Sequence, residues 1–271
     1  MSLRRLINAF SAALLFLSPL AVSAQTNVGH DYSLGVAGYY TDRFDPAGFS
    51  VANGIHGRNN VLQLMIDQST NLANRPAWAQ STFYNTQGRK LDVNTPGSWF
   101  YQNDLYIESS WANNANGFIR TDLWATATND LAFSNVTAYP IIGVTNYGGS
   151  LRARGWDGGQ WVDFGRSLNL GGWNTLGMAF DASTNMFSYS VNGTQVASFA
   201  AGTSTGVANI MVQGYNFCDP AIMNVSNPCN PNETYSWSNT QTVPEPSTYA
   251  LFAAGLAGMA VARRRRRPMV S

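Results

Sequence analysis

Charged residues and cysteines are scarce in this sequence. Charged side chains make up 11% of its 271 residues, and Lys90 is the single lysine. The two cysteines form no Cys-x-x-Cys pair, no histidine lies beside them, and no glycine-rich phosphate loop occurs. The two histidines, His30 and His56, have no triad partner that the sequence identifies. These absences argue against a zinc site and a nucleotide-binding site.

Glutamates are also few, which bears on catalysis. Glycoside hydrolysis usually needs two carboxylates on either side of the scissile bond, about 5 Å apart in retaining enzymes. Between residues 25 and 242 the only glutamates are Glu108 and Glu233. The nearest approach to a carboxylate pair, Asp104 and Glu108, would lie about 13 Å apart along a strand. We interpret this pair as the polar outer face of a strand and predict no enzyme. A polysaccharide hydrolase or lyase remains the alternative.

Long apolar runs occur only at the two ends of the chain. Arg4 and Arg5 precede an apolar stretch from Ala9 to Val22, and small residues lead to Ala24. This pattern predicts a signal peptide over residues 1–24, cleaved after Ala24 by signal peptidase. The alternative is a permanent membrane anchor, which Pro19 and the small residues before the cleavage point disfavour.

The C-terminus combines three elements over residues 243–271. An apolar segment spans residues 249–262 and is followed by five arginines; at about 1.5 Å per residue it is roughly 21 Å long, short of the roughly 30 Å hydrocarbon core. It therefore predicts a short transmembrane helix that holds the chain in the inner membrane only transiently, with the arginines on the cytoplasmic side. The residues that define these elements are Pro244, Glu245, Pro246, Arg263, Arg264, Arg265, Arg266 and Arg267.

A Pro-Glu-Pro motif, an apolar segment and an arginine cluster in this order resemble the PEP-CTERM protein-sorting signal. The resemblance implies a Gram-negative bacterium that makes extracellular polysaccharide, and an exosortase that removes the tail during export. It also implies a final location at the cell surface or outside the cell. A nucleic-acid-binding tail is the alternative, but it would require a cytoplasmic protein, and the signal peptide argues against one.

Processing changes the charge of the protein. Removing Arg4, Arg5, the five tail arginines and Glu245 leaves nine basic and 14 acidic residues, a net charge of −5. Such a domain offers no basic surface to nucleic acid. In an oxidising exported compartment, Cys218 and Cys229 are predicted to form a disulfide that closes an irregular loop.

Between the ends, apolar residues alternate in short runs that predict strands. The clearest case is Phe187–Val191 and Thr194–Ser198 around Asn192-Gly193, the strongest short signal for a two-residue hairpin, with Tyr189 opposite Val196. Other runs predicted as strands are 61–67, 100–109, 117–125, 139–146, 151–156, 160–164, 175–181 and 208–215. We predict an all-β fold, a two-sheet antiparallel sandwich over residues 25–235, with a linker over 236–242.

The run from Gly172 to Asp181, followed by Tyr189–Gly193, resembles two adjoining strands of laminin G-like domains in the concanavalin A-like lectin/glucanase superfamily. The resemblance implies a jelly roll of that superfamily. Because the superfamily contains lectins, glucanases and adhesive modules, the fold alone does not decide function.

Aromatic residues and hydrogen-bonding groups that could bind a sugar gather around a Gly-Gly turn. The predicted carbohydrate-binding residues are Tyr147, Arg154, Trp156, Asp157, Gln160 and Trp161. The alternative is that Trp156 and Trp161 pack in the core. A second candidate is the loop Trp111–Gly117, for carbohydrate or, with Asp122 or Asp130, for a structural calcium ion. The sequence thus favours a non-catalytic protein that binds extracellular polysaccharide, with a ligand-free structural role as a further alternative.

Overall fold

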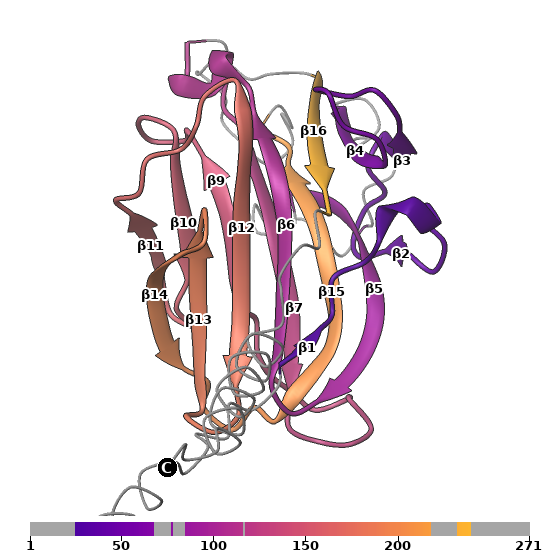
Figure 1. The fold of residues 1–271 in the computed structure, drawn as a ribbon, viewed down its shortest axis with the longest axis vertical. Helices are drawn as coiled ribbons and strands as arrows, with labels where there is room; N and C mark the ends of the chain where they lie inside the picture. The colour runs from indigo at the N-terminus through magenta and orange to yellow at the C-terminus, as the bar shows by residue number, and fades with distance from the viewer. Residues whose placement is uncertain (1–24, 68–76, 78–84, 116, 218–231, 240–271) are drawn as a thin grey trace, which may run out of the picture. The chain divides into compact units, whose positions relative to one another are not determined.

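Two eight-stranded β-sheets build the described part of the chain (Figure 1). The structure, a computed structural model, describes residues 25–67, 77, 85–115, 117–217 and 232–239. Residues 25–242 form one compact unit. The predicted signal peptide, sorting tail and Cys218–Cys229 disulfide lie outside the described residues. Among those that are described, no helix has the length and apolar character needed to cross a membrane.

The first sheet, sheet A, has seven strands in a continuous antiparallel order. In that order they are β14 (Thr194–Ala200), β13 (Met186–Val191), β12 (Gly172–Asp181), β6 (Trp99–Ile107), β16 (Asn232–Ser238), β4 (Val61–Asp67) and β3 (Gly48–Ala52). The short β1 (Thr26–Asn27) pairs with β6 in parallel. The last strand of the domain, β16, therefore lies in the interior of the sheet, between β6 and β4.

The second sheet, sheet B, is antiparallel throughout. Its order is β11 (Trp161–Phe164), β10 (Arg152–Trp156), β9 (Ile141–Thr145), β7 (Arg120–Thr128), β15 (Gly206–Tyr215), β5 (Thr86–Pro96) and β2 (Tyr40–Thr41). The short β8 (Val136–Ala138) pairs with β7. Two 3₁₀ helices, η1 (Tyr32–Leu34) and η3 (Ser109–Ala112), lie in the connections. In Figure 1 most of the long strands of both sheets are aligned with the vertical axis of the view.

The core forms where alternate residues of the two sheets meet. Trp99 and Tyr101 from β6 and Tyr235 and Trp237 from β16 are fully buried there with residues of sheet B such as Ile142. Period-two alternation in the sequence produces this arrangement because successive side chains of a strand point to opposite faces. The two packed antiparallel sheets confirm the predicted all-β sandwich.

The hairpin between β13 and β14 forms as predicted, with a changed register. Asn192 and Gly193 have φ values of 51° and 73°, the two positive values that a type I′ turn requires. Tyr189, however, lies opposite Ala197 rather than Val196, because a register shift follows between Tyr189 and Ser190. A β-bulge of this kind places two residues opposite one, which turn residues alone do not predict.

Some strands were not predicted from the sequence. The predicted linker over 236–242 differs from the structure, since Ser236 to Ser238 belong to β16 and Trp237 is fully buried. The 11-residue β5 was missed because most of its residues are polar or charged and Leu91 and Val93 are the only large apolar residues in it. The strand predicted over 100–109 also ends earlier than expected, because β6 stops at Ile107 and Glu108 is the N-cap residue of the 3₁₀ helix η3.

Candidate functional site: a groove on the outer face of sheet B

An aromatic and apolar row crosses the outer face of sheet B. Strand register places Trp156 opposite both Trp161 and Ile141, Ile141 opposite Trp124, and Trp124 opposite Met211. These five residues form an apolar cluster of their own, separate from the core between the sheets. Their outward position follows from alternation, because their neighbours along each strand point inward. The row thus gives the outer face of five adjacent strands a continuous apolar floor.

A polar row runs beside the aromatic one. Here Arg154 lies opposite Gly143, Gly143 opposite Asp122, and Asp122 opposite Gln213. A Cβ atom on Gly143 would overlap Asp122 Oδ1 and the carbonyl oxygen of Thr121. Only glycine therefore lets the Asp122 carboxyl lie flat against the neighbouring strand.

Asp122 holds the neighbouring Arg120 in place. Arg120 Nε donates a 2.7 Å hydrogen bond to Asp122 Oδ2, and Gln213 Nε2 donates to the same oxygen at 3.3 Å. The Arg120 guanidinium lies 4.7 Å from the ring centroid of Trp161 and 5.2 Å from that of Tyr215. Arg120 is thus neutralised by a buried carboxylate and fixed against two rings that face the groove.

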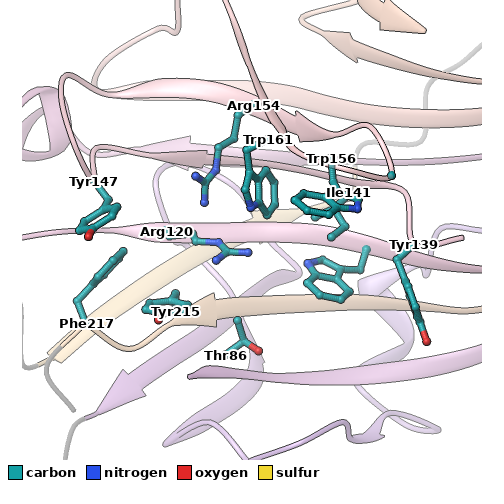
Figure 2. A pocket seen from close by; sticks show the side chains of 12 residues that line it. Thr86, Arg120, Tyr139, Ile141, Tyr147, Arg154, Trp156, Trp161, Tyr215 and Phe217 are labelled. Atoms are coloured by element: carbon teal, nitrogen blue, oxygen red, sulfur yellow. The ribbon is translucent and has the colours of Figure 1, made fainter. Parts of the chain in front are cut away.

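Arg154 is held differently. Arg154 as a whole is 8% exposed, and its guanidinium lies 4.0 Å from the ring centroid of Trp161. Burial, the largest influence, lowers its pKa to about 10, opposed by the charge of Asp122. Figure 2 shows its side chain directed into the groove, on the same side as Arg120.

These rows form the floor of a groove of about 810 Å³, within the usual range for ligand sites. At one end Tyr147, which is 44% exposed, stacks on Phe217 at 5.2 Å between ring centroids; Tyr139 stands at the other end (Figure 2). The lining residues are Thr86, Arg120, Trp124, Tyr139, Ile141, Tyr147, Arg154, Trp156, Gly158, Trp161, Tyr215 and Phe217.

Four of the six predicted sugar-binding residues line this groove, namely Tyr147, Arg154, Trp156 and Trp161. The alternative interpretation, that the two tryptophans pack in the core, is wrong. Both are partly exposed on the outer face of sheet B.

The other two predicted residues, Asp157 and Gln160, shape the adjacent turn. Asp157 Oδ1 accepts hydrogen bonds from the backbone N–H groups of Gly159 (2.8 Å) and Gln160 (2.7 Å). These bonds lower the pKa of Asp157. Neither residue is among those that line the groove.

Several groove residues were missed because they come from strands distant in sequence. Arg120 and Trp124 lie on β7, Tyr215 on β15 and Thr86 on β5. One signal was available in the sequence, since Arg120-x-Asp122-x-Trp124 places three functional side-chain types on one face of a strand. The pairing order of the sheet was needed to bring that face beside Arg154.

At the second predicted site, the loop Trp111–Gly117 with Asp130, several polar groups already form hydrogen bonds within the protein. The Asn146 side-chain amide donates to the carbonyl oxygens of Asn113 (3.0 Å) and Gly117 (3.2 Å), and Asn113 Oδ1 accepts from the Ala115 backbone. Asp130 accepts hydrogen bonds from Ser134 and Asn135 in its own turn. Within the ranges the structure describes, no group of three or more His, Cys, Asp or Glu side chains is arranged to hold a metal ion.

Of the carboxylates considered for catalysis, Asp104 lies on β6 of sheet A and Glu108 directly follows that strand. Asp104 Oδ2 pairs with Arg58 at 2.6 Å and its Oδ1 accepts a hydrogen bond from Thr175, while Glu108 Oε1 lies 3.4 Å from His56 Nε2. None of the twelve residues lining the groove is a carboxylate.

A Gly-x-Ser-x-Gly pattern, typical of serine hydrolases, spans Gly202 to Gly206 and was missed in the sequence. It lies in the turn before β15, where Ser204 is buried and shares a 2.7 Å hydrogen bond with Thr137 Oγ1. Both histidines interact elsewhere, His30 with the Gly35 carbonyl and His56 with Glu108. The pattern therefore lacks the strand-to-helix elbow and the base that a serine nucleophile needs.

Comparison with known proteins gives a sequence match at one end and fold matches for the rest. Residues 242–267 match the model of the PEP-CTERM protein-sorting motif. No curated protein sequence matches the chain.

Three solved structures illustrate the fold matches. A sialidase is 12% identical with a TM-score of 0.48 over 80% of this chain, which spans only 18% of that protein. A β-1,3-1,4-glucanase (lichenase) from a mouse hindgut metagenome is 14% identical, with a TM-score of 0.42 over 74% of this chain and 90% of its own. The carbohydrate-binding module CBM66 from Bacillus subtilis is 11% identical, with a TM-score of 0.36 over 66% of this chain and 91% of its own.

Proposed function

We propose that this chain, which carries a PEP-CTERM sorting motif at residues 242–267, is an exported protein whose groove binds extracellular polysaccharide without cleaving it. The observation that carries the proposal is the composition of the open groove. Its floor is a row of tryptophans, and two guanidinium groups lie beside them. Aromatic faces stack on the apolar faces of sugar rings, and guanidinium groups donate several hydrogen bonds to sugar oxygens.

The sorting motif supports the location. It implies export and processing by an exosortase. We propose that signal peptidase removes residues 1–24, that the inner membrane holds the apolar segment transiently, and that the mature protein remains at the cell surface or in the matrix. There the groove would meet polysaccharide directly.

Among the described residues that line the groove there is no carboxylate, and this supports a non-catalytic role. Asp122, beneath the groove, is 1% exposed at its side chain and is already bonded to Arg120 and Gln213. A glycosidase needs a pair of carboxylates with access to the scissile bond. New reducing or unsaturated chain ends released by the wild-type protein, and lost in a groove variant, would contradict this part of the proposal.

A glycan array that includes the exopolysaccharide of the producing cell tests binding by the exported protein. We expect retention on at least one polysaccharide, and about a tenfold loss of affinity for Trp161→Ala, because Trp161 contributes to the floor and contacts the guanidinium groups of both Arg120 and Arg154. Trp173→Ala, which removes a tryptophan from sheet A, is the matched control and should bind as the wild type does. Equal loss in both variants, or no retention on any glycan, would refute the proposed site.

A further inference from the structure

Arg154 differs from the other described arginines that are at least partly buried. Arg43, Arg58, Arg89, Arg120 and Arg152 each have a nitrogen within 3.2 Å of an aspartate oxygen. Arg154 forms no hydrogen bond and no ion pair with any residue that the structure describes, and its Nε is buried without a partner.

Because Arg154 is buried, the lack of a partner for its charge destabilises the folded state. Arg154 is 8% exposed, and its contact with the Trp161 ring supplies only a cation–π interaction. A buried charge normally requires a counter-ion together with hydrogen bonds, and without them it destabilises the folded state. Stability of the fold therefore gives no reason for an arginine at this position.

The nearby carboxylates are already neutralised by other arginines. Asp122 pairs with Arg120 at 2.7 Å, and Asp163, opposite Arg154 on β11, pairs with Arg152 at 2.7 Å. Three guanidinium groups thus face two carboxylates, which leaves one positive charge in a domain whose predicted net charge is −5. The uncompensated charge is the one on Arg154, and its side chain is directed into the groove (Figure 2).

We propose that Arg154 is the anion-recognising residue of the groove, and that the polysaccharide bound there is acidic, presenting a carboxylate or sulfate to its guanidinium. The inference rests on the proposed function and deepens it. A planar guanidinium binds a carboxylate or sulfate through two parallel hydrogen bonds, so the ligand would satisfy the Arg154 nitrogens that the protein leaves unpaired. The sugar ring carrying the anion would lie over the neighbouring tryptophans.

Two matched polymer pairs test this proposal with the exported protein. Polygalacturonate is compared with its carboxyl-reduced form, and dextran sulfate with dextran, so that the two pairs distinguish a carboxylate from a sulfate. We expect the wild type to bind the acidic member of one pair about tenfold more tightly than its neutral counterpart. Arg154→Gln should abolish that preference and keep the weaker neutral binding.

Arg166→Gln is the matched control, because it removes the same charge from an exposed residue outside the groove lining. It should retain the full preference, which separates local recognition from net charge. An undiminished preference for the acidic polymer in Arg154→Gln would overturn the inference. Equal binding of acidic and neutral polymers by the wild type would also overturn it, but would leave the proposed function standing. Failure to bind these polymers and every glycan on the array would instead overturn the proposed function itself.

Discussion

At the scale of a single side chain, Arg154 lowers the stability of the fold, although we propose that it contributes to binding. Burial lowers the pKa of Arg154 to about 10, below the ordinary value for an arginine, so folding disfavours its charged form throughout neutral pH. The shift corresponds to at most about 3 kcal/mol of lost stability. That cost should disappear as pH rises from about 10 towards 12.5, where the unfolded chain also loses the proton.

We therefore expect Arg154→Gln to unfold at a higher urea concentration than the wild type at pH 7. After allowance for the lost contact with Trp161, the gain in the free energy of unfolding should be about 1 kcal/mol. The difference between variant and wild type should narrow above about pH 10. A loss of stability at pH 7 would mean that Arg154 has a structural partner.

Gly143 is required for a different reason, the close approach of two strands. Gly143→Ala would force its new Cβ against Asp122 Oδ1 and the Thr121 backbone, and we expect a loss of about 1–3 kcal/mol in the free energy of unfolding. Gly149→Ala is the control, since the atom nearest to its new Cβ would be Arg152 Nη1 at 3.7 Å. Chemical denaturation of both variants decides the matter, and equal stability would contradict the steric argument.

The buried pair between Asp122 and Arg120 should also be sensitive to loss of one partner. Asp122→Asn leaves the Arg120 guanidinium, whose side chain is 13% exposed, without its counter-ion. We expect a loss of about 3 kcal/mol in the free energy of unfolding and weaker glycan binding. Asp163→Asn, in which the carboxylate is 54% exposed, should change stability by less than about 1 kcal/mol. Similar losses in both variants, measured by denaturation, would show that burial does not set the cost.

At the scale of secondary-structure elements, β16 is the last strand that the structure describes. Trp237 is fully buried and donates a 3.2 Å hydrogen bond from its indole nitrogen to Thr121 Oγ1 on the opposite sheet. Trp237→Ala should cost about 3–5 kcal/mol of stability. A mature chain ending at residue 235 should fail to fold, whereas one ending at 242 should fold; circular dichroism and thermal melting of the two truncations test this.

The elements also show which structural information was local in the sequence. The Asn192-Gly193 turn needs positive φ at both residues, and it could be predicted because asparagine and glycine adopt positive φ most readily. In contrast, β16 follows a segment rich in proline and asparagine and is polar at alternate positions, so its burial depends on pairing with β4, about 170 residues earlier. Arg154, Trp156 and Trp161 were identified because they lie on the hairpin around one Gly-Gly turn, and Tyr147 lies a few residues before that hairpin. Arg120, Trp124 and Tyr215 were missed because only the strand order of sheet B places them nearby.

On the scale of the whole molecule, the sorting motif bears on which charges the exported protein keeps. We expect exported material to lack Arg263–Arg267, because the match at residues 242–267 implies exosortase processing. Intact-mass analysis of the exported protein tests this. A variant with Pro244→Ala and Pro246→Ala should retain the tail and stay with the membrane fraction. Finding the five arginines on exported wild-type protein would contradict processing.

The interior position of β16 also has a consequence for the timing of export. A chain that crosses the membrane from its N-terminus delivers β4 and β6 early, but the gap between them is filled only when residues 232–238 have emerged. Sheet A consequently cannot close until translocation has almost reached the sorting tail, and contacts between such distant segments form slowly in any case. The order of strands thus makes sheet A complete only when residues 232–238 are available, which is late in any process that delivers the chain from its N-terminus.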